Sequence, residues 1–74
     1  MIVRGRELHL KRQIEAALVR NARTDPERVS VEVHGEKVIL RGTVRSSAEK
    51  QEAEWIAWSA PGVHSVDNQI RISL

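Results

Sequence analysis

The two tryptophans of this chain, Trp55 and Trp58, are its only aromatic side chains, because the sequence contains no Phe and no Tyr. They lie three positions apart in the segment EWIAWSAPG, so a helix would place them on one side. An indole ring binds by burying apolar area while its N–H stays hydrated, which suits contact with a membrane surface or another protein. The chemistry that these residues offer is therefore binding.

The residues that could catalyse a reaction or hold a metal form no known motif. His9, His34 and His64 fall in different predicted elements without the spacing of a zinc motif, and the chain has no Cys. Ser46 and Ser47 stand where a predicted helix starts, and neither a nucleophile elbow nor a phosphate-binding glycine loop is present. We therefore expect a non-catalytic protein without a cofactor or a metal.

A helix is predicted to carry the tryptophans, beginning after Ser46 and ending near Ser59 or Ala60. Ser46 followed by Glu49 fits a capping box, in which the two residues satisfy free N–H groups at the helix start. The pair Pro61-Gly62 is typical of a position just beyond a helix end.

The apolar face of this helix predicts which way the tryptophans point. Small and branched apolar residues occupy a stripe of about 100° on the helical wheel. The members of this stripe are Ala53, Ile56, Ala57 and Ala60. With the stripe in the interior, both indoles project into solvent beside Gln51, and the opposite orientation would bury Glu54. The alternative is that one ring, Trp58 more readily than Trp55, folds back over the flank of the helix.

Charged residues of both signs lie near the tryptophans. Lys50 and Arg45 are close enough in sequence to flank the indoles, but Glu49, Glu52 and Glu54 are equally near. The acidic residues disfavour strong binding to anionic lipid, so lipid contact and protein contact, including a homodimer through this helix, both remain open. The predicted binding residues are Trp55, Trp58, Gln51, Lys50 and Arg45.

Length and composition indicate a single small domain, predicted to span residues 1–74. The chain is 41% hydrophobic and 30% charged, which is typical of globular domains. Its net charge is only +2, with Glu and Arg interspersed, so we expect no nucleic-acid partner. The N-terminal segment MIVRGRELHL lacks the apolar region of a signal peptide. We expect a cytoplasmic location if the chain is complete, and the periplasm or cell envelope if it was excised from a longer protein.

The segment before the tryptophan helix predicts one helix and a hairpin. Apolar residues with helical spacing run from Leu10 to Leu18 and predict a helix. It is expected to begin near Arg6 or Glu7 and to end between Asn21 and Arg23, where Thr24-Asp25-Pro26 breaks it. Alternation predicts a strand over residues 29–34 and a second over 38–44, joined at Gly35. Gly42 lies inside the second strand, which is typical of a bulge or a close approach by a neighbouring element.

A last strand is predicted from Val63 to Ile72, with apolar positions at Val63, Val66, Ile70 and Ile72. Asn68 and Arg71 are placed on its outer side. The resulting order αββαβ predicts an α+β fold in which two helices pack on one face of a three-stranded mixed sheet.

These elements together resemble a BON domain, a module named from bacterial osmotically induced and nodulation-linked proteins. The resemblance covers about residues 8–73 and depends on the order of VSVEVHGEKVILRGTV, the Ala-rich helix and PGVHSVDNQI. It implies the same αββαβ fold, a non-enzymatic role in binding phospholipid surfaces or proteins, and a mostly envelope location. It also implies structural roles for Gly42 and Gly62, to which we add Gly35. Trp55 and Trp58 depart from the family, which usually has polar or charged residues there.

Overall fold

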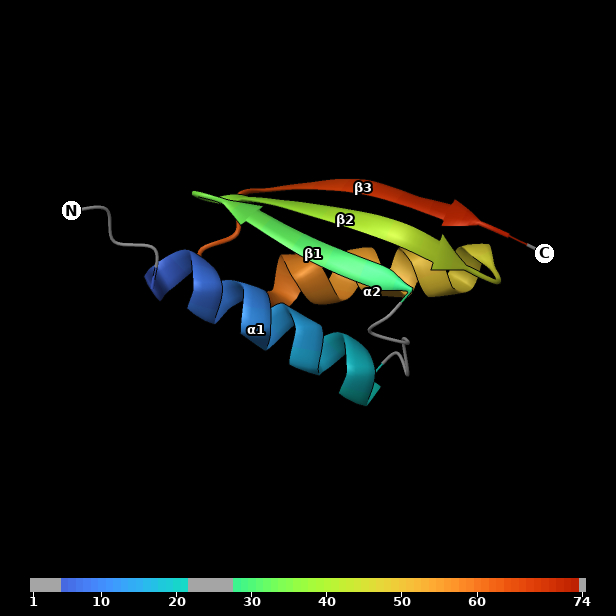
Figure 1. The fold of residues 1–74 in the computed structure, drawn as a ribbon, viewed down its shortest axis with the longest axis horizontal. Helices are drawn as coiled ribbons and strands as arrows, with labels where there is room; N and C mark the ends of the chain where they lie inside the picture. Colours follow the sequence, from blue (N-terminus) through green and yellow to red (C-terminus); the bar gives the residue numbers. More distant parts are fainter. Residues whose placement is uncertain (1–4, 22–27, 74) are drawn as a thin grey trace.

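The computed structural model describes residues 5–21 and 28–73, whose elements follow the order α1, β1, β2, α2, β3 (Figure 1). The bounds are Gly5–Asn21 for α1, Val29–His34 for β1, Lys37–Val44 for β2, Ser47–Ser59 for α2 and Ser65–Ile72 for β3. The predicted α+β fold is confirmed. The predicted break at Thr24-Asp25-Pro26 lies outside the described residues.

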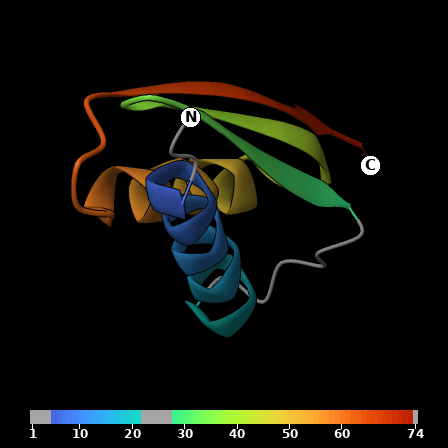
Figure 2. The same cartoon turned by 60° about the vertical axis from the view of Figure 1, so that its left-hand side comes forward.

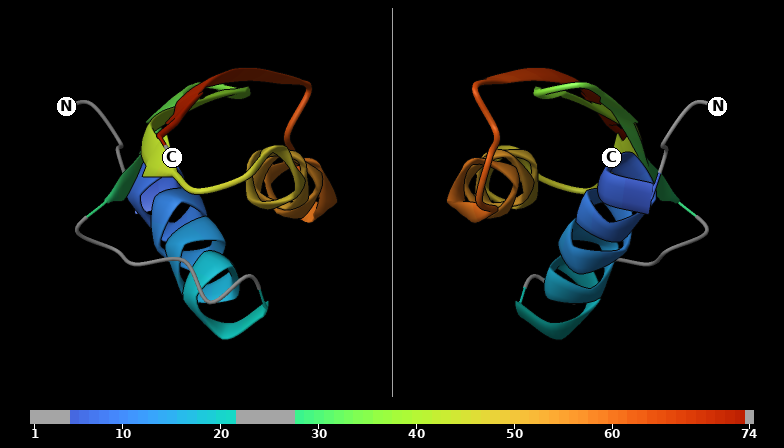
Figure 3. Two further views of the ribbon diagram at one scale, coloured as in Figure 1. Left: turned by 90° about the vertical axis from the view of Figure 1, so that its right-hand side faces the viewer. Right: turned by 90° about the vertical axis from the view of Figure 1, so that its left-hand side faces the viewer.

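The three strands form one mixed sheet in the order β1-β2-β3. β1 pairs antiparallel with β2, and β2 pairs parallel with β3, so that Leu40 lies between Val31 and Asn68. Both helices cover the same face of the sheet and leave the other face open (Figures 1 and 3). α1 packs against β1, whereas α2 crosses under β2 and β3.

The core lies between this sheet face and the two helices, whose axes are not parallel (Figure 2). The predicted helical face of α1 is confirmed, because Leu10, Ile14 and Leu18 are buried. The other buried core residues are Val29, Val31, Val38, Leu40, Val44, Ala53, Ala57 and Ile70. Such a small core leaves each buried side chain a large share of the stability.

Gly42 marks a close approach of two strands, as its position in the sequence predicted. It pairs with Val29 and has a φ of +136°, a conformation that other residues rarely adopt. A Cβ built on Gly42 would overlap the carbonyl oxygen of Arg28 and lie 2.8 Å from the Cα of Val29. The Arg28 carbonyl also accepts a hydrogen bond of 3.0 Å from the N–H of Thr43. Only glycine fits at position 42 without displacing the backbone of Arg28 and Val29.

The prediction for the last strand was wrong in two respects. β3 begins at Ser65, so Val63 precedes the strand and packs partly buried against the core. Asn68 does not lie on the outer side, because it alternates with Val66 and Ile70 on the face that the helices cover. The apolar spacing misled the assignment because this inner position holds a polar side chain.

Candidate binding site on helix α2

The first turn of α2 is held by a side-chain cap. The hydroxyl oxygen of Ser46 accepts a hydrogen bond of 3.3 Å from the N–H of Glu49. The carboxylate of Glu49 turns back and accepts one of 3.2 Å from the N–H of Arg45. The predicted pairing of Ser46 with Glu49 at the start of the helix is confirmed.

The inner face of α2 is the alanine stripe that the sequence predicted. Ala53 and Ala57 are completely buried, and Ile56 and Ala60 pack partly buried against the core. Small side chains let the helix lie close to β2 and β3, and they fix its rotation about its own axis. The opposite side of α2 is consequently turned away from the sheet.

Both tryptophans are on this outward side, to different extents. Trp55 is 78% exposed and Trp58 is 45% exposed. The predicted outward direction is confirmed for both rings, and Trp58 is also partly shielded, in line with the alternative for that residue. The hydroxyl of Ser59 donates a 2.9 Å hydrogen bond to the carbonyl of Trp55.

The exposed surface of α2 carries little charge. A shallow depression beside Trp55 is lined by this residue together with Ala48, Gln51, Glu52 and Glu54. Within α2, Glu52 is the only exposed charged residue. The remaining exposed residues form what we call the uncharged stripe: Ser47, Ala48, Gln51, Trp55, Trp58 and Ser59.

The predicted basic residues do not join the tryptophans. Lys50 is partly buried and lies about 140° around the helix from Trp55. Arg45 precedes the cap, ten residues before Trp55, which corresponds to about 15 Å along a helix. The structure therefore brings Gln51 to the indoles and leaves Lys50 and Arg45 apart from them. A role for these two residues in binding stays a prediction.

Asn68 connects β3 to the flank of α2, a contact that the sequence reasoning missed. Its side-chain nitrogen donates to the carbonyl of Lys50 at 3.0 Å and to the carboxylate of Glu54 at 3.2 Å. Its side-chain oxygen accepts a 3.1 Å hydrogen bond from the N–H of Ile70. The sequence did offer a signal for this contact, because Asn68 is a polar residue at a position where the strand otherwise has apolar residues. A partly buried amide at such a position needs hydrogen-bond partners from neighbouring elements.

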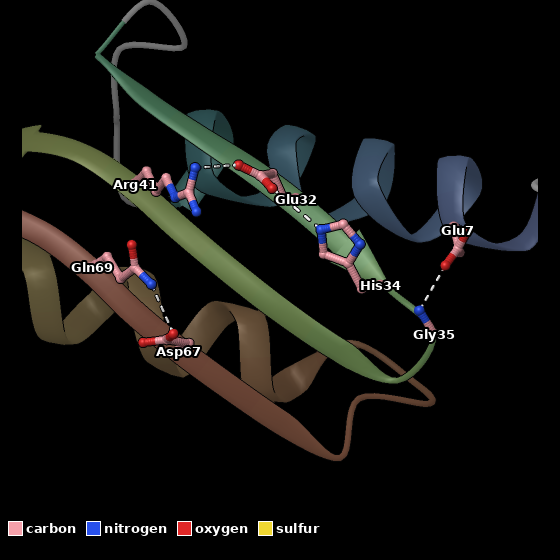
Figure 4. Close-up of polar contacts among 7 residues, drawn as sticks. All are labelled: Glu7, Glu32, His34, Gly35, Arg41, Asp67 and Gln69. Atoms are coloured by element: carbon pink, nitrogen blue, oxygen red, sulfur yellow. Dashed lines mark hydrogen bonds and ion pairs between the residues drawn. The ribbon is translucent and has the colours of Figure 1, made fainter.

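The open face of the sheet is polar and carries charges of both signs (Figure 4). Glu32 accepts from Arg41 at 2.9 Å and lies 3.2 Å from the ring nitrogen of His34. On β3 the amide of Gln69 donates to Asp67 at 2.8 Å. Exposed pairs of this kind contribute little to stability and indicate a solvated surface.

The described residues were also compared with two other kinds of functional feature, a membrane-spanning helix and a metal site. Neither α1 nor α2, the helices of the described residues, is long and apolar enough to cross a membrane. Residues 5–21 and 28–73 contain no group of three His, Asp or Glu side chains placed to share a metal ion. The outward side of α2, with its two exposed indoles, is the candidate binding surface.

Comparison with known protein families identifies the BON domain, whose family model matches residues 7–73. The match confirms the resemblance and covers nearly the whole chain. BON domains are binding domains to which phospholipid binding is attributed, and they are not known as catalysts. A comparison with curated proteins found no match.

Proposed function

This chain belongs to the BON domain family, and we propose that it is a non-catalytic module that attaches to a phospholipid surface through α2. The observation that carries the proposal is the exposure of Trp55, 78%, and of Trp58, 45%, on one side of a single helix. Adjacent exposed aromatic rings on a small domain are typical of a surface that contacts another molecule.

Indole rings suit the boundary between headgroups and acyl chains. The ring body enters the apolar layer while the N–H stays hydrated. A helix lying in the plane of the interface buries its apolar side about 5–10 Å deep, and α2 offers such a side without unfolding. At about 25 cal/mol per Å² of buried apolar area, two partly exposed rings contribute a few kcal/mol. We therefore expect weak, reversible attachment.

Vesicle binding tests this proposal. The protein is mixed with vesicles of phosphatidylcholine, with or without phosphatidylglycerol, and binding is followed by flotation and by tryptophan emission. We expect co-flotation and a blue shift with at least one composition. Trp55→Ala with Trp58→Ala should abolish flotation, which is needed as the readout because this variant has no tryptophan to follow.

The matched control is Leu8→Ala with Val19→Ala on α1. These side chains are 47% and 46% exposed, so this variant also loses exposed apolar area, but from the other helix. It should float as the unaltered protein does. Absence of flotation and of a blue shift with both compositions contradicts the proposal, as does full flotation of the double tryptophan variant.

A second candidate is protein contact through the same indoles, including a homodimer through α2. It is favoured by Glu52, an exposed acidic residue three positions from Trp55, because a carboxylate at this position disfavours an anionic lipid surface. Tryptophan is also a preferred anchor at protein interfaces. In sedimentation velocity, concentration-dependent association that Trp55→Ala with Trp58→Ala abolishes, without vesicle binding, would support this candidate.

A further inference from the structure

We infer that α1 binds a second copy of this chain in a symmetric antiparallel pair, which goes beyond the proposed attachment and does not depend on it. The contact surface is what we call the outer flank of α1: Leu8, Arg12, Glu15 and Val19. Their spacing of four, three and four residues places these side chains within about 60° of one another around the helix, along about 17 Å of its length.

The outer flank is turned away from α2. Ile14 is buried in the core, and on one side of it Gln13 and Ala17 line a depression. The opposite wall of this depression belongs to α2 and includes Ile56 and Ala60. The outer flank is on the other side of Ile14, about 130° around the helix. Because α1 packs under β1, this side of α1 lies at an outer edge of the domain (Figure 3).

The ends of the outer flank are apolar, and its middle carries opposite charges. Leu8 is 47% exposed and Val19 is 46% exposed. Between them, Arg12 is exposed and Glu15 is half-buried, and neither forms an ion pair with another described residue. A second α1 laid antiparallel can set Leu8 against Val19 of the other copy. The same register sets Arg12 against Glu15 of the other copy, and two-fold symmetry repeats each contact.

The other charged side chains of α1 lie outside this contact. The flank toward α2 carries its remaining basic residues apart from Lys11, which are Arg6, His9 and Arg20. The carboxylate of Glu7 accepts a 2.6 Å hydrogen bond from the N–H of Gly35 in the hairpin. Lys11 is half-buried at the margin of the outer flank, where it meets Ala16 of the second copy. Arg12 and Glu15 are therefore the charges that decide the register.

This pairing leaves α2 uncovered, so each copy keeps its own indoles. It therefore differs from a homodimer through α2, in which the tryptophans would be buried. A single helix pair of this length buries less than the roughly 1,600 Å² of a standard interface, so we expect weak, reversible association.

Charge exchange tests the pairing, with sedimentation velocity from micromolar to millimolar concentrations as the readout. The unaltered protein should associate as its concentration rises. Arg12→Glu alone and Glu15→Arg alone each turn two attractive pairs into repulsive ones, so we expect either change to weaken dimerisation about tenfold. An equimolar mixture of these two variants should associate again, because each chain then offers the charge that the other requires. Mixing could not restore an ion pair formed within one chain.

Arg6→Glu is the matched control, because it reverses an exposed arginine of α1 outside the outer flank, and it should dimerise as the unaltered protein does. Leu8→Ala with Val19→Ala should lose association, whereas Trp55→Ala with Trp58→Ala should keep it. Circular dichroism checks that each variant retains its helices. A protein that is monomeric at every concentration, a mixture that does not associate, or loss of association in the tryptophan variant overturns the inference. Vesicle flotation decides the proposed attachment separately.

Discussion

The side-chain amide of Asn68 donates a 3.0 Å hydrogen bond to the main-chain carbonyl of Lys50, joining β3 to the middle of α2. The same nitrogen also donates to the carboxylate of Glu54, and the side-chain oxygen accepts from the N–H of Ile70. This contact helps to set how α2 lies under the sheet. Because α2 carries the tryptophans, the contact also helps to set where they lie.

Replacing Asn68 should therefore destabilise the domain. Asn68→Ala removes three hydrogen bonds and leaves the N–H of Ile70 without that partner, so we expect a loss of about 1–3 kcal/mol in the free energy of unfolding. This loss is measured by urea denaturation with circular dichroism as the readout. Gln69→Ala, at the exposed neighbouring position, should change the stability by less than about 0.5 kcal/mol. Equal effects of the two substitutions would refute the role assigned to Asn68.

Substitution of Gly42 should be among the most damaging single changes. In Gly42→Ala the new methyl group overlaps the carbonyl of Arg28 at a φ of +136°, so strain and steric overlap add. We expect a loss of about 3 kcal/mol or more, measured by thermal denaturation. Gly62→Ala is the control, because its φ of +87° is also unfavourable but nothing lies within 4 Å of the new Cβ. If Gly62→Ala proved the more damaging, steric overlap at Gly42 would not be the cause.

The cap of α2 can be tested at Ser46. Ser46→Ala removes the hydroxyl that accepts from the N–H of Glu49, so we expect a loss of about 1 kcal/mol in the free energy of unfolding. Ser47→Ala, at the exposed first residue of the helix, should leave stability nearly unchanged. Chemical denaturation compares the two, and an effect confined to Ser47 would contradict the assigned cap.

The unequal exposure of the two indoles can be measured in solution. Trp58→Phe leaves Trp55 as the sole fluorophore, and Trp55→Phe leaves Trp58. Acrylamide should quench Trp55 more strongly than Trp58, in rough proportion to exposed fractions of 78% and 45%. Emission from Trp55 should also lie at longer wavelength. Stronger quenching of Trp58 would mean that α2 is rotated relative to the arrangement described.

The sequence by itself determined the helices, the hairpin and the outward side of α2. These follow from local periodicity: residues three and four apart share a helix face, and alternate residues share a strand face. Leu10, Ile14 and Leu18 show the first pattern, and Val29 and Val31 show the second, all five in the core. The direction of the tryptophans followed in the same way from Ala53 and Ala57.

Tertiary structure alone decided the partners of Asn68. The partners of Asn68 on α2, Glu54 and Lys50, are 14 and 18 residues away in sequence, so no local period reveals that this inner strand position faces a helix carbonyl and a carboxylate. Lys50 was expected near the indoles from its proximity in sequence, although helix geometry already places it about 140° from Trp55. Tertiary structure decided only that this flank of α2 lies beside β3. A side chain's partners depend on which elements pack together, and that information is long-range.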